Sequence, residues 1–139
     1  MSPSDIKTWH RGGEQDIYVG DLAAKGESGE LGIGFSHYGR GASMDWITAY
    51  DEAIFIMSGK LTIRRDGEAD VSAGAGEMLF VKRGTTFTYV AEEDTDMVYV
   101  TYPHWDVANE KDGLTHLFDK FQDSGSNGPA QVPSGGLQN

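Results

Sequence analysis

Two carboxylates head an otherwise apolar stretch, Tyr50 to Gly59, whose letters are YDEAIFIMSG. In a β-strand successive side chains point to opposite faces, so Asp51 and Glu52 should point in opposite directions. Only one of them can face the interior. A carboxylate buried among apolar side chains has a raised pKa, which suits it to donate or accept a proton near neutral pH. This stretch is therefore the leading candidate for chemistry.

The same segment, read as one strand from Met44 to Met57, supplies further candidates. Tyr50 and Glu52 are two positions apart, so their Cα atoms should lie about 6.6 Å apart and both could contact one small substrate. We expect Glu52 to be a general acid or base and Tyr50 its hydrogen-bonding partner. A structural role is the alternative, with Glu52 a core carboxylate bonded to Tyr50 or to the backbone. Upstream of Tyr50, Trp46 and Thr48 share this face, and downstream of Glu52, Ile54 and Ile56 do so too.

Histidines are the other candidate proton-transfer groups. His37 falls on the apolar face of the alternating segment LGIGFSHY, residues 31–38, and His104 follows Pro103 at the end of an expected strand. We expect one of these two to be a second proton-transfer or orienting group. For His37, a packed core position is an equal alternative. His116 is expected on a solvated helix face, and His10 has no interpretable context.

Short strands must position these residues. The chain has 19 glycines and 4 prolines, and apolar or alternating runs recur at regular spacing. This pattern is typical of an all-β sandwich or barrel, and the Asp-Gly pair at residues 66–67 is a hairpin signal. Over residues 112–122 apolar side chains recur at i, i+3, i+4 and i+7, which predicts a short C-terminal helix. The expected strand-forming runs are 16–22, 31–38, 44–57, 61–65, 77–83, 85–91 and 96–103.

Composition restricts the class of protein. We expect one domain over residues 1–122, with an N-terminal arm, followed by a Gly/Ser/Pro-rich tail over 123–139. There is no cysteine, so disulfides and thiolate chemistry are excluded. The start lacks the apolar run of a signal peptide, and we expect a cytoplasmic protein. A net charge of −11 argues against nucleic acid and membrane partners.

Three segments, in order, resemble the cupins. Glu52 and Gly59 have the spacing of the Glu and Gly in the first cupin motif, and Gly76 and Gly84 have that of the two glycines in the second. More narrowly, W-x3-YDE-x6-G, GEMLFVKRGTTFTY and VYVTYPHW resemble the cupin domain of the ethanolamine-utilisation protein Q family. The resemblance covers about residues 31–106. It implies a cupin-type β-barrel, or jelly roll, in which Glu52 is the inward carboxylate.

The resemblance also exposes a departure. Metal-binding cupins carry two histidines just upstream of this Glu and a third in the second motif. Here the upstream positions hold Trp46 and Thr48, or Asp45 and Ile47 if the spacer is one residue longer, and the second-motif position holds Phe87. Transition metals favour imidazole ligands, so we expect no metal cofactor. The disfavoured alternative is a divalent metal on three other ligands: Glu52, His37 and His104.

We therefore predict a small-molecule enzyme that performs general acid–base chemistry of the lyase, isomerase or hydrolase type without a redox metal. The resemblance implies a second candidate, an ethanolamine-utilisation-type accessory protein or acetate kinase, although the chain has no glycine-rich phosphate loop. A non-catalytic ligand-binding module is the third. Since the outward residues Ala53, Phe55 and Met57 are also apolar, we expect a homodimer or the C-terminal helix to cover them. The expected substrate-binding residues, for which a plain barrel-core position is the alternative, are Trp46, Thr48, Phe87 and Tyr89.

Overall fold

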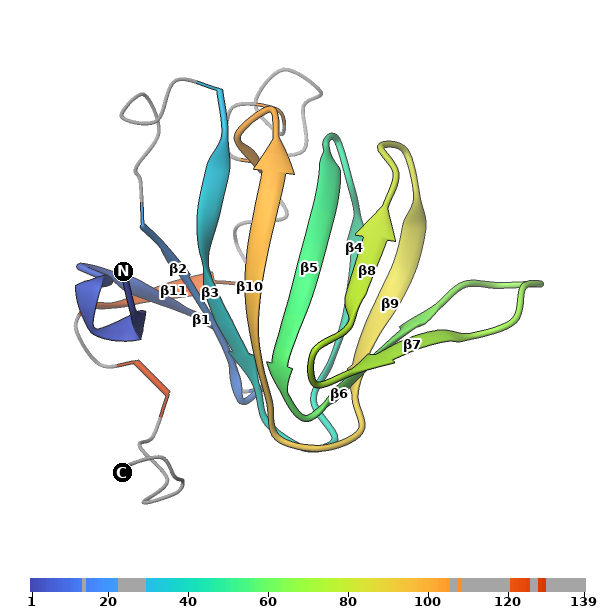
Figure 1. Ribbon diagram of the computed structural model, residues 1–139, viewed down its shortest axis with the longest axis horizontal. Coiled ribbons are helices and arrows are strands. Elements are labelled where there is room, and N and C mark those ends of the chain that lie inside the picture. The colour runs from blue at the N-terminus through green and yellow to red at the C-terminus, as the bar shows by residue number, and fades with distance from the viewer. Residues whose placement is uncertain (14, 23–29, 106–107, 109–120, 126–127, 130–139) are drawn as a thin grey trace.

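The computed structural model describes residues 1–13, 15–22, 30–105, 108, 121–125 and 128–129 (Figure 1). Among the elements whose bounds the structure describes, all but a one-turn 3-10 helix, η1 (Pro3–Asp5), are strands, which confirms the all-β prediction. No helix among the described residues is long and apolar enough to cross a membrane. The strands are β1 (Trp9–Gly12), β2 (Ile17–Asp21), β3 (Gly32–Tyr38), β4 (Ser43–Ile47), β5 (Asp51–Ser58), β6 (Lys60–Arg64), β7 (Val71–Gly74), β8 (Met78–Val81), β9 (Thr86–Ala91), β10 (Thr95–Tyr102) and β11 (Phe121–Gly125).

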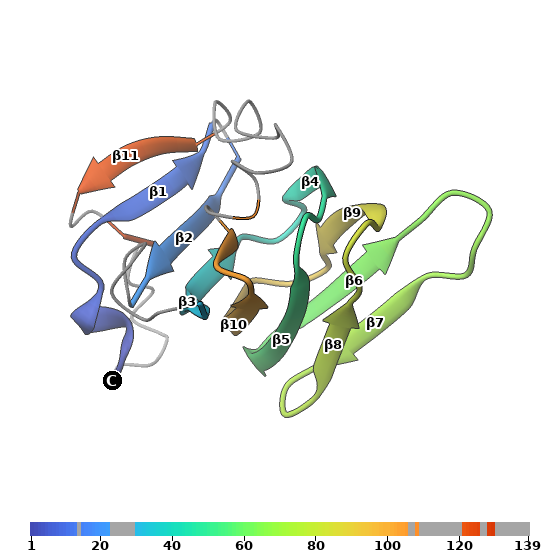
Figure 2. The same cartoon turned by 90° about the horizontal axis from the view of Figure 1, so that it is seen from above.

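The strands form two antiparallel sheets. The larger has the order β11-β1-β2-β3-β10-β5-β8, and the smaller has the order β4-β9-β6-β7. Figure 2 shows β4, β9 and β6 on the opposite side of the barrel from β3, β10 and β5. Both sheets contribute buried side chains to one central core, including Trp46 from β4, Ile54 from β5 and Phe87 from β9. The interior between the sheets is therefore where a pocket can form.

Strand β5 settles which of the two carboxylates faces inward. Burial alternates along it: Glu52 and Ile54 are buried, while Asp51 and Phe55 are exposed. The register with β10 pairs Glu52 with Thr101. The parity deduced from the sequence is confirmed, and Glu52 is the inward acid.

The expected single strand over residues 44–57 is wrong. It divides into β4 and β5, which belong to different sheets. Thr48 holds the corner between them, because its backbone N–H donates to the carbonyl of Thr85 at 3.1 Å and its own carbonyl accepts from Gly84 at 2.8 Å. The chain can therefore cross from one wall of the barrel to the other within a few residues.

Strand β3 also differs from expectation in the face that it turns to the core. Its apolar side carries Phe35, which packs in an outer cluster with Ile6, Trp9 and Tyr18. Its inner side carries Tyr38, which belongs to the central core. The N-terminal segment supplies the second layer that the apolar side of β3 needs.

The expected C-terminal helix, residues 112–122, lies mostly outside the described residues. Its last two positions are described, and they begin strand β11, which pairs antiparallel with β1. The first three residues of the expected tail, 123–125, complete this strand. The rest of that tail, except residues 128–129, lies outside the described residues.

Candidate functional site

A pocket opens between the two sheets, with an empty volume of about 520 Å³ that includes its mouth. One carboxylate, Glu52, and two aliphatic hydroxyls, Ser36 and Thr101, lie on its wall. Among the described residues, no lysine, arginine or histidine lines it. Six aromatic residues make up much of the remaining wall: Tyr38, Trp46, Tyr50, Tyr89, Tyr99 and Trp105.

Glu52 is the centre of the pocket. Only 7% of its surface is exposed, and the Tyr89 hydroxyl donates a hydrogen bond to its Oε1 atom. Among the described residues, no donor contacts its other oxygen, Oε2. Burial raises the pKa of Glu52 from its ordinary 4.5 to about 7, and the hydrogen bond from Tyr89 opposes part of that rise. Near neutral pH the side chain therefore exchanges between its acid and base forms.

Tyr50 lies beside Glu52 but bonds elsewhere. Its hydroxyl oxygen accepts a hydrogen bond from Trp46 Nε1 at 2.7 Å. The expected Tyr50–Glu52 hydrogen bond is therefore not formed, and Tyr89 takes that place. Burial, and then the charge of Glu52, raises the pKa of Tyr50 well above its usual value. Tyr50 stays protonated, and because Trp46 occupies the oxygen, its O–H is left to donate to a ligand.

Three residues at the pocket were missed by the sequence interpretation. Thr101 has a buried hydroxyl with no hydrogen-bond partner among the described residues. Tyr99 donates to Asp21, which also accepts from Trp105 Nε1 at 3.0 Å. Met97, Tyr99 and Thr101 alternate along β10 and all line the pocket, so the parity argument applied to that strand would have found Tyr99 and Thr101.

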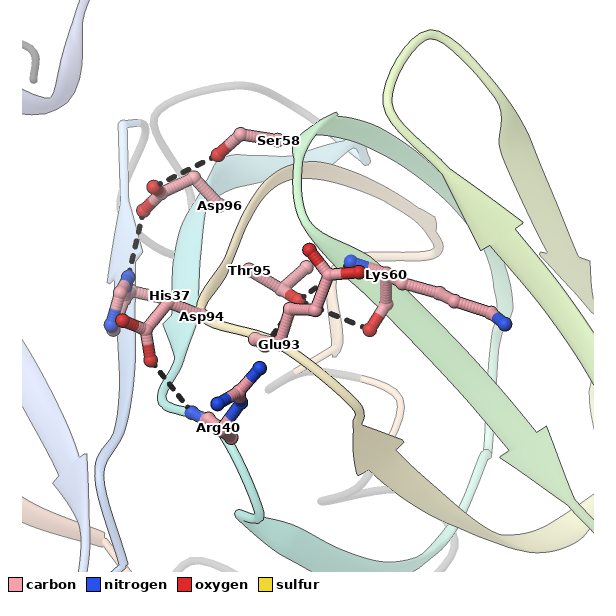
Figure 3. Close-up of polar contacts among 8 residues, drawn as sticks. All are labelled: His37, Arg40, Ser58, Lys60, Glu93, Asp94, Thr95 and Asp96. Atoms are coloured by element: carbon pink, nitrogen blue, oxygen red, sulfur yellow. Dashed lines mark hydrogen bonds and ion pairs between the residues drawn. The ribbon is translucent and has the colours of Figure 1, made fainter. Parts of the chain in front are cut away.

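His37 does not reach the pocket. It lies on the other face of β3, where its Nδ1 atom is 2.8 Å from Asp96 Oδ1, and the Ser58 hydroxyl donates to Asp96 Oδ2 at 3.2 Å (Figure 3). Burial alone lowers the pKa of His37, but the hydrogen bond to Asp96 and the charges of Asp96, Asp16 and Asp94 together raise it above 6.5. A second proton-transfer group would have to lie near Glu52, and the structure does not place His37 there.

The other expected site residues divide into two groups. Trp46 and Tyr89 line the pocket. His104 is 1% exposed, stacks on Trp105 and has its Nε2 atom 3.9 Å from Asp21 Oδ2, so it stands behind the wall rather than on it. Thr48 donates to the carbonyl of Lys82 at the sheet corner, and Phe87 packs against the edge of Tyr89. Neither of these last two lines the pocket.

The donors of the pocket do not fit a transition metal. Within the part of the chain that the structure describes, no three His, Cys, Asp or Glu side chains come together as metal ligands. The described lining of the pocket offers one carboxylate together with phenols and aliphatic hydroxyls, and it includes none of the imidazoles that such ions prefer. The chemistry that these side chains can perform is proton transfer by protein groups.

Comparison with known proteins gives a consistent family match. Residues 7–107 match the family described as ethanolamine utilisation protein EutQ. The chain is 34% identical over 102 residues to acetate kinase EutQ of Clostridioides difficile (strain 630), covering 73% of this chain and 57% of that protein. It is 26% identical to acetate kinase EutQ of Salmonella typhimurium, covering 72% and 44%. The chain thus spans about half the length of the curated relatives it matches.

Solved structures support the same fold. The structure of the Clostridium difficile EutQ protein superposes with a TM-score of 0.61 at 34% identity, over 65% of each chain. Ectoine synthase from P. lautus has a TM-score of 0.60 at 17% identity, over 70% of this chain and 71% of that one. A cupin domain of an XRE family transcriptional regulator from Enterobacter cloacae has 0.55 at 15%, over 63% and 97%. The last two show the fold alone, and the expected cupin fold is confirmed.

Proposed function

The chain belongs to the ethanolamine utilisation protein EutQ family, and from that premise we propose that it is a small-molecule enzyme whose pocket performs general acid–base chemistry. The proposal rests on Glu52, a buried carboxylate with a pKa of about 7 that faces an open pocket. A general base is most effective when its pKa lies near the working pH. A carboxylate with only a structural role would not require an open pocket beside it, so the pocket favours a role in chemistry.

Three side chains divide the work. Glu52 Oε2 takes a proton from the substrate, while the Tyr89 hydroxyl holds Oε1 and stabilises the ionised form. Tyr50, whose oxygen is fixed by Trp46 Nε1, donates its O–H to the substrate oxygen on which negative charge develops. The aromatic walls keep bulk water from the reacting atoms. Each proton-transfer group of this kind contributes about 10²- to 10⁴-fold to the rate.

Acetate kinase is the second candidate, and the names of the curated relatives favour it. An ATP-dependent kinase needs Mg²⁺ and cationic side chains around the phosphates. The described lining of the pocket supplies neither lysine nor arginine. A kinase function would therefore depend on residues outside this pocket, and the chain spans only about half of those relatives. A binding module that performs no reaction is the third candidate.

Infrared difference spectroscopy and kinetics test the first candidate. The wild-type protein should show a carboxylic-acid band that titrates near pH 7 and is absent from Glu52→Gln, whereas Asp51→Asn should retain it. In D₂O, the wild type should exchange α-protons of small carbonyl compounds about 10²- to 10⁴-fold faster than Glu52→Gln. Titration of the band below pH 5 would remove the basis for an acid–base role. Release of ADP from Mg-ATP and acetate, undiminished in Glu52→Gln, would favour the kinase.

A further inference from the structure

The charge of the pocket is one-sided. Among the described residues, Glu52 is the only carboxylate on its wall, and no cationic side chain lines it. Taking an ionised carboxylate out of water costs several kcal/mol unless a proton or a cation compensates the charge. The hydrogen bond from Tyr89 compensates only in part, because the pKa of Glu52 remains at about 7. The ionised form of Glu52 therefore needs a positive partner, and the described residues supply none.

The rest of the wall suits such a partner. Trp46 and Trp105 lie on it together with the four tyrosines, and the face of an aromatic ring attracts cations within about 6 Å. The same ring faces repel anions, and so does Glu52. Apolar groups attached to a cation would pack against the rings, while the positive centre approaches Oε2. The net charge of −11 on the chain adds a weaker attraction of the same sign.

We propose that the pocket binds a small organic ammonium ion, with Glu52 as its counter-ion and the aromatic walls around its carbon groups. The inference deepens the proposed function and rests on it, because it names the charge of the substrate that the same pocket takes. A primary ammonium can donate hydrogen bonds to Oε2 and to the unpartnered Thr101 hydroxyl. A quaternary ammonium has no N–H to donate, so the charge of Glu52 and the faces of the rings would hold it.

Binding of a cation must be coupled to the protonation of Glu52. The cation stabilises the ionised form, so its binding lowers the pKa of Glu52 and releases protons, and by linkage its affinity rises with pH. Burial raises the pKa of all four neighbouring phenols, so they keep their protons in this range. Asp21 lies behind Tyr99 and already accepts two hydrogen bonds. The titratable groups that face Glu52 are Tyr38 from β3, Tyr50 from the sheet corner, Tyr89 from β9 and Tyr99 from β10.

The size of the coupling follows from a pKa of about 7. The ionised fraction of Glu52 rises about tenfold between pH 6 and pH 8, so the affinity for a cation should rise about tenfold over the same range. At pH 7 binding should release up to about half a proton per ligand. An anion such as acetate would show the reverse, with protons taken up and affinity falling as pH rises.

Isothermal titration calorimetry on the wild-type chain tests this with two matched pairs of probes. One pair is ethanolammonium and propanol, and the other is choline and dimethylbutanol; in each pair a carbon replaces the charged nitrogen. Repeating the titration in buffers of different ionisation enthalpy gives the number of protons released. At pH 8 we expect one of the two ammonium ions to bind at least about tenfold more tightly than its uncharged partner. This preference in the ethanolammonium pair would indicate a primary ammonium ligand, and in the choline pair a quaternary one.

Variants assign the effect to the pocket. Glu52→Gln should lose the preference for the charged probe and the proton release. Asp51→Asn removes the same charge one residue away on the exposed face, and its amide oxygen can still accept from the backbone of Arg83, so it should behave as wild type. If Glu52→Gln fails to fold, the proton release of the wild type alone still decides.

Three results would overturn the inference: equal affinity for both members of each pair, tighter binding of acetate with proton uptake, or no binding of either ammonium ion at millimolar concentration. Failure of the proposed function looks different. Ammonium binding with proton release but no turnover would leave the inference and remove the catalytic role. Glu52-dependent turnover of an uncharged compound, without ammonium binding, would do the opposite.

Discussion

Replacing Glu52 by glutamine should change the way in which the stability of the protein depends on pH. Burial raises the pKa of this carboxyl from 4.5 to about 7 in the folded protein. Between those values the unfolded chain has lost the proton and the folded chain still holds it. The unfolded state binds fewer protons, so the free energy of unfolding falls as pH rises through this window and levels off above about pH 7. The total loss is roughly 3 kcal/mol.

The Glu52→Gln side chain has the same shape, keeps a carbonyl oxygen to accept from Tyr89, and carries no charge at any pH. Relative to wild type, the variant should therefore gain about 2 to 3 kcal/mol in its free energy of unfolding between pH 5 and pH 8. Urea denaturation at each pH measures both proteins. Groups elsewhere, such as the His37–Asp96 pair, are shared by the two chains and cancel in the difference.

Asp51→Asn is the matched control, because it removes a carboxylate from the exposed face of the same strand. Its difference from wild type should vary far less with pH. Parallel curves for Glu52→Gln and wild type would mean that Glu52 keeps one charge state from pH 5 to pH 8. A group of that kind is not poised to exchange protons near neutrality. That result would refute the reasoning behind both its catalytic role and its proton-coupled binding of a cation.

Four further outcomes are expected. Tyr89→Phe removes the hydrogen bond that lowers the pKa of Glu52, so the infrared band of Glu52 should titrate at a higher pH than in wild type; an unchanged midpoint would contradict this contact. Phe55 is 39% exposed on the outer sheet face, where a second copy of the chain could cover it. In that case Phe55→Glu should convert a dimer to a monomer in light scattering. A monomeric wild type would exclude that interface. The hydrogen bond between Asp96 and His37 lowers the pKa of Asp96 below 3.8 and, against the effect of burial, helps to raise the pKa of His37 above 6.5. The pair therefore stabilises the fold between these two pKa values, and the effect is lost as pH rises through the raised pKa of His37. Asp96→Asn should accordingly cost more stability at pH 5.5 than at pH 8, and equal losses at both would argue against a charged pair. Elemental analysis of protein purified without added metal should find far less than one transition-metal ion per chain, and a stoichiometric ion lost in Glu52→Gln would overturn the metal-free interpretation.

The inward position of Glu52 was within reach of the sequence, because side chains alternate along a strand and only one of two neighbouring acids can face the core. The same rule led to a wrong expectation for His37. Alternation shows that β3 has an apolar face, but not which layer covers it. Here the N-terminal residues Ile6 and Trp9 cover that face from outside, and the core receives Tyr38 from the other face.

Contacts between the two sheets could not be predicted from the sequence, for a different reason. Tyr89 and Glu52 are 37 residues apart, and Trp105 and Asp21 are 84 apart, so no local pattern joins them. Which tyrosine donates to Glu52 depends on how the two sheets are packed. The strand of residues 121–125 was missed because FQDSG has neither alternation nor β-branched residues, and its pairing with β1 overrides its weak propensity.

The three positions where metal-binding cupins carry histidines explain why Glu52 behaves differently here. Trp46 and Phe87 are register partners on β4 and β9; Trp46 lines the pocket, Phe87 packs in the core against Tyr89, and the third residue, Thr48, turns away to the carbonyl of Lys82. A metal ion would hold the nearby carboxylate ionised. Without one, desolvation is the largest influence, and it raises the pKa of Glu52 towards neutrality. If no metal binds, as we propose, these three residues leave Glu52 free to exchange a proton near neutral pH, and Trp46 offers an aromatic ring against which a cationic ligand could pack.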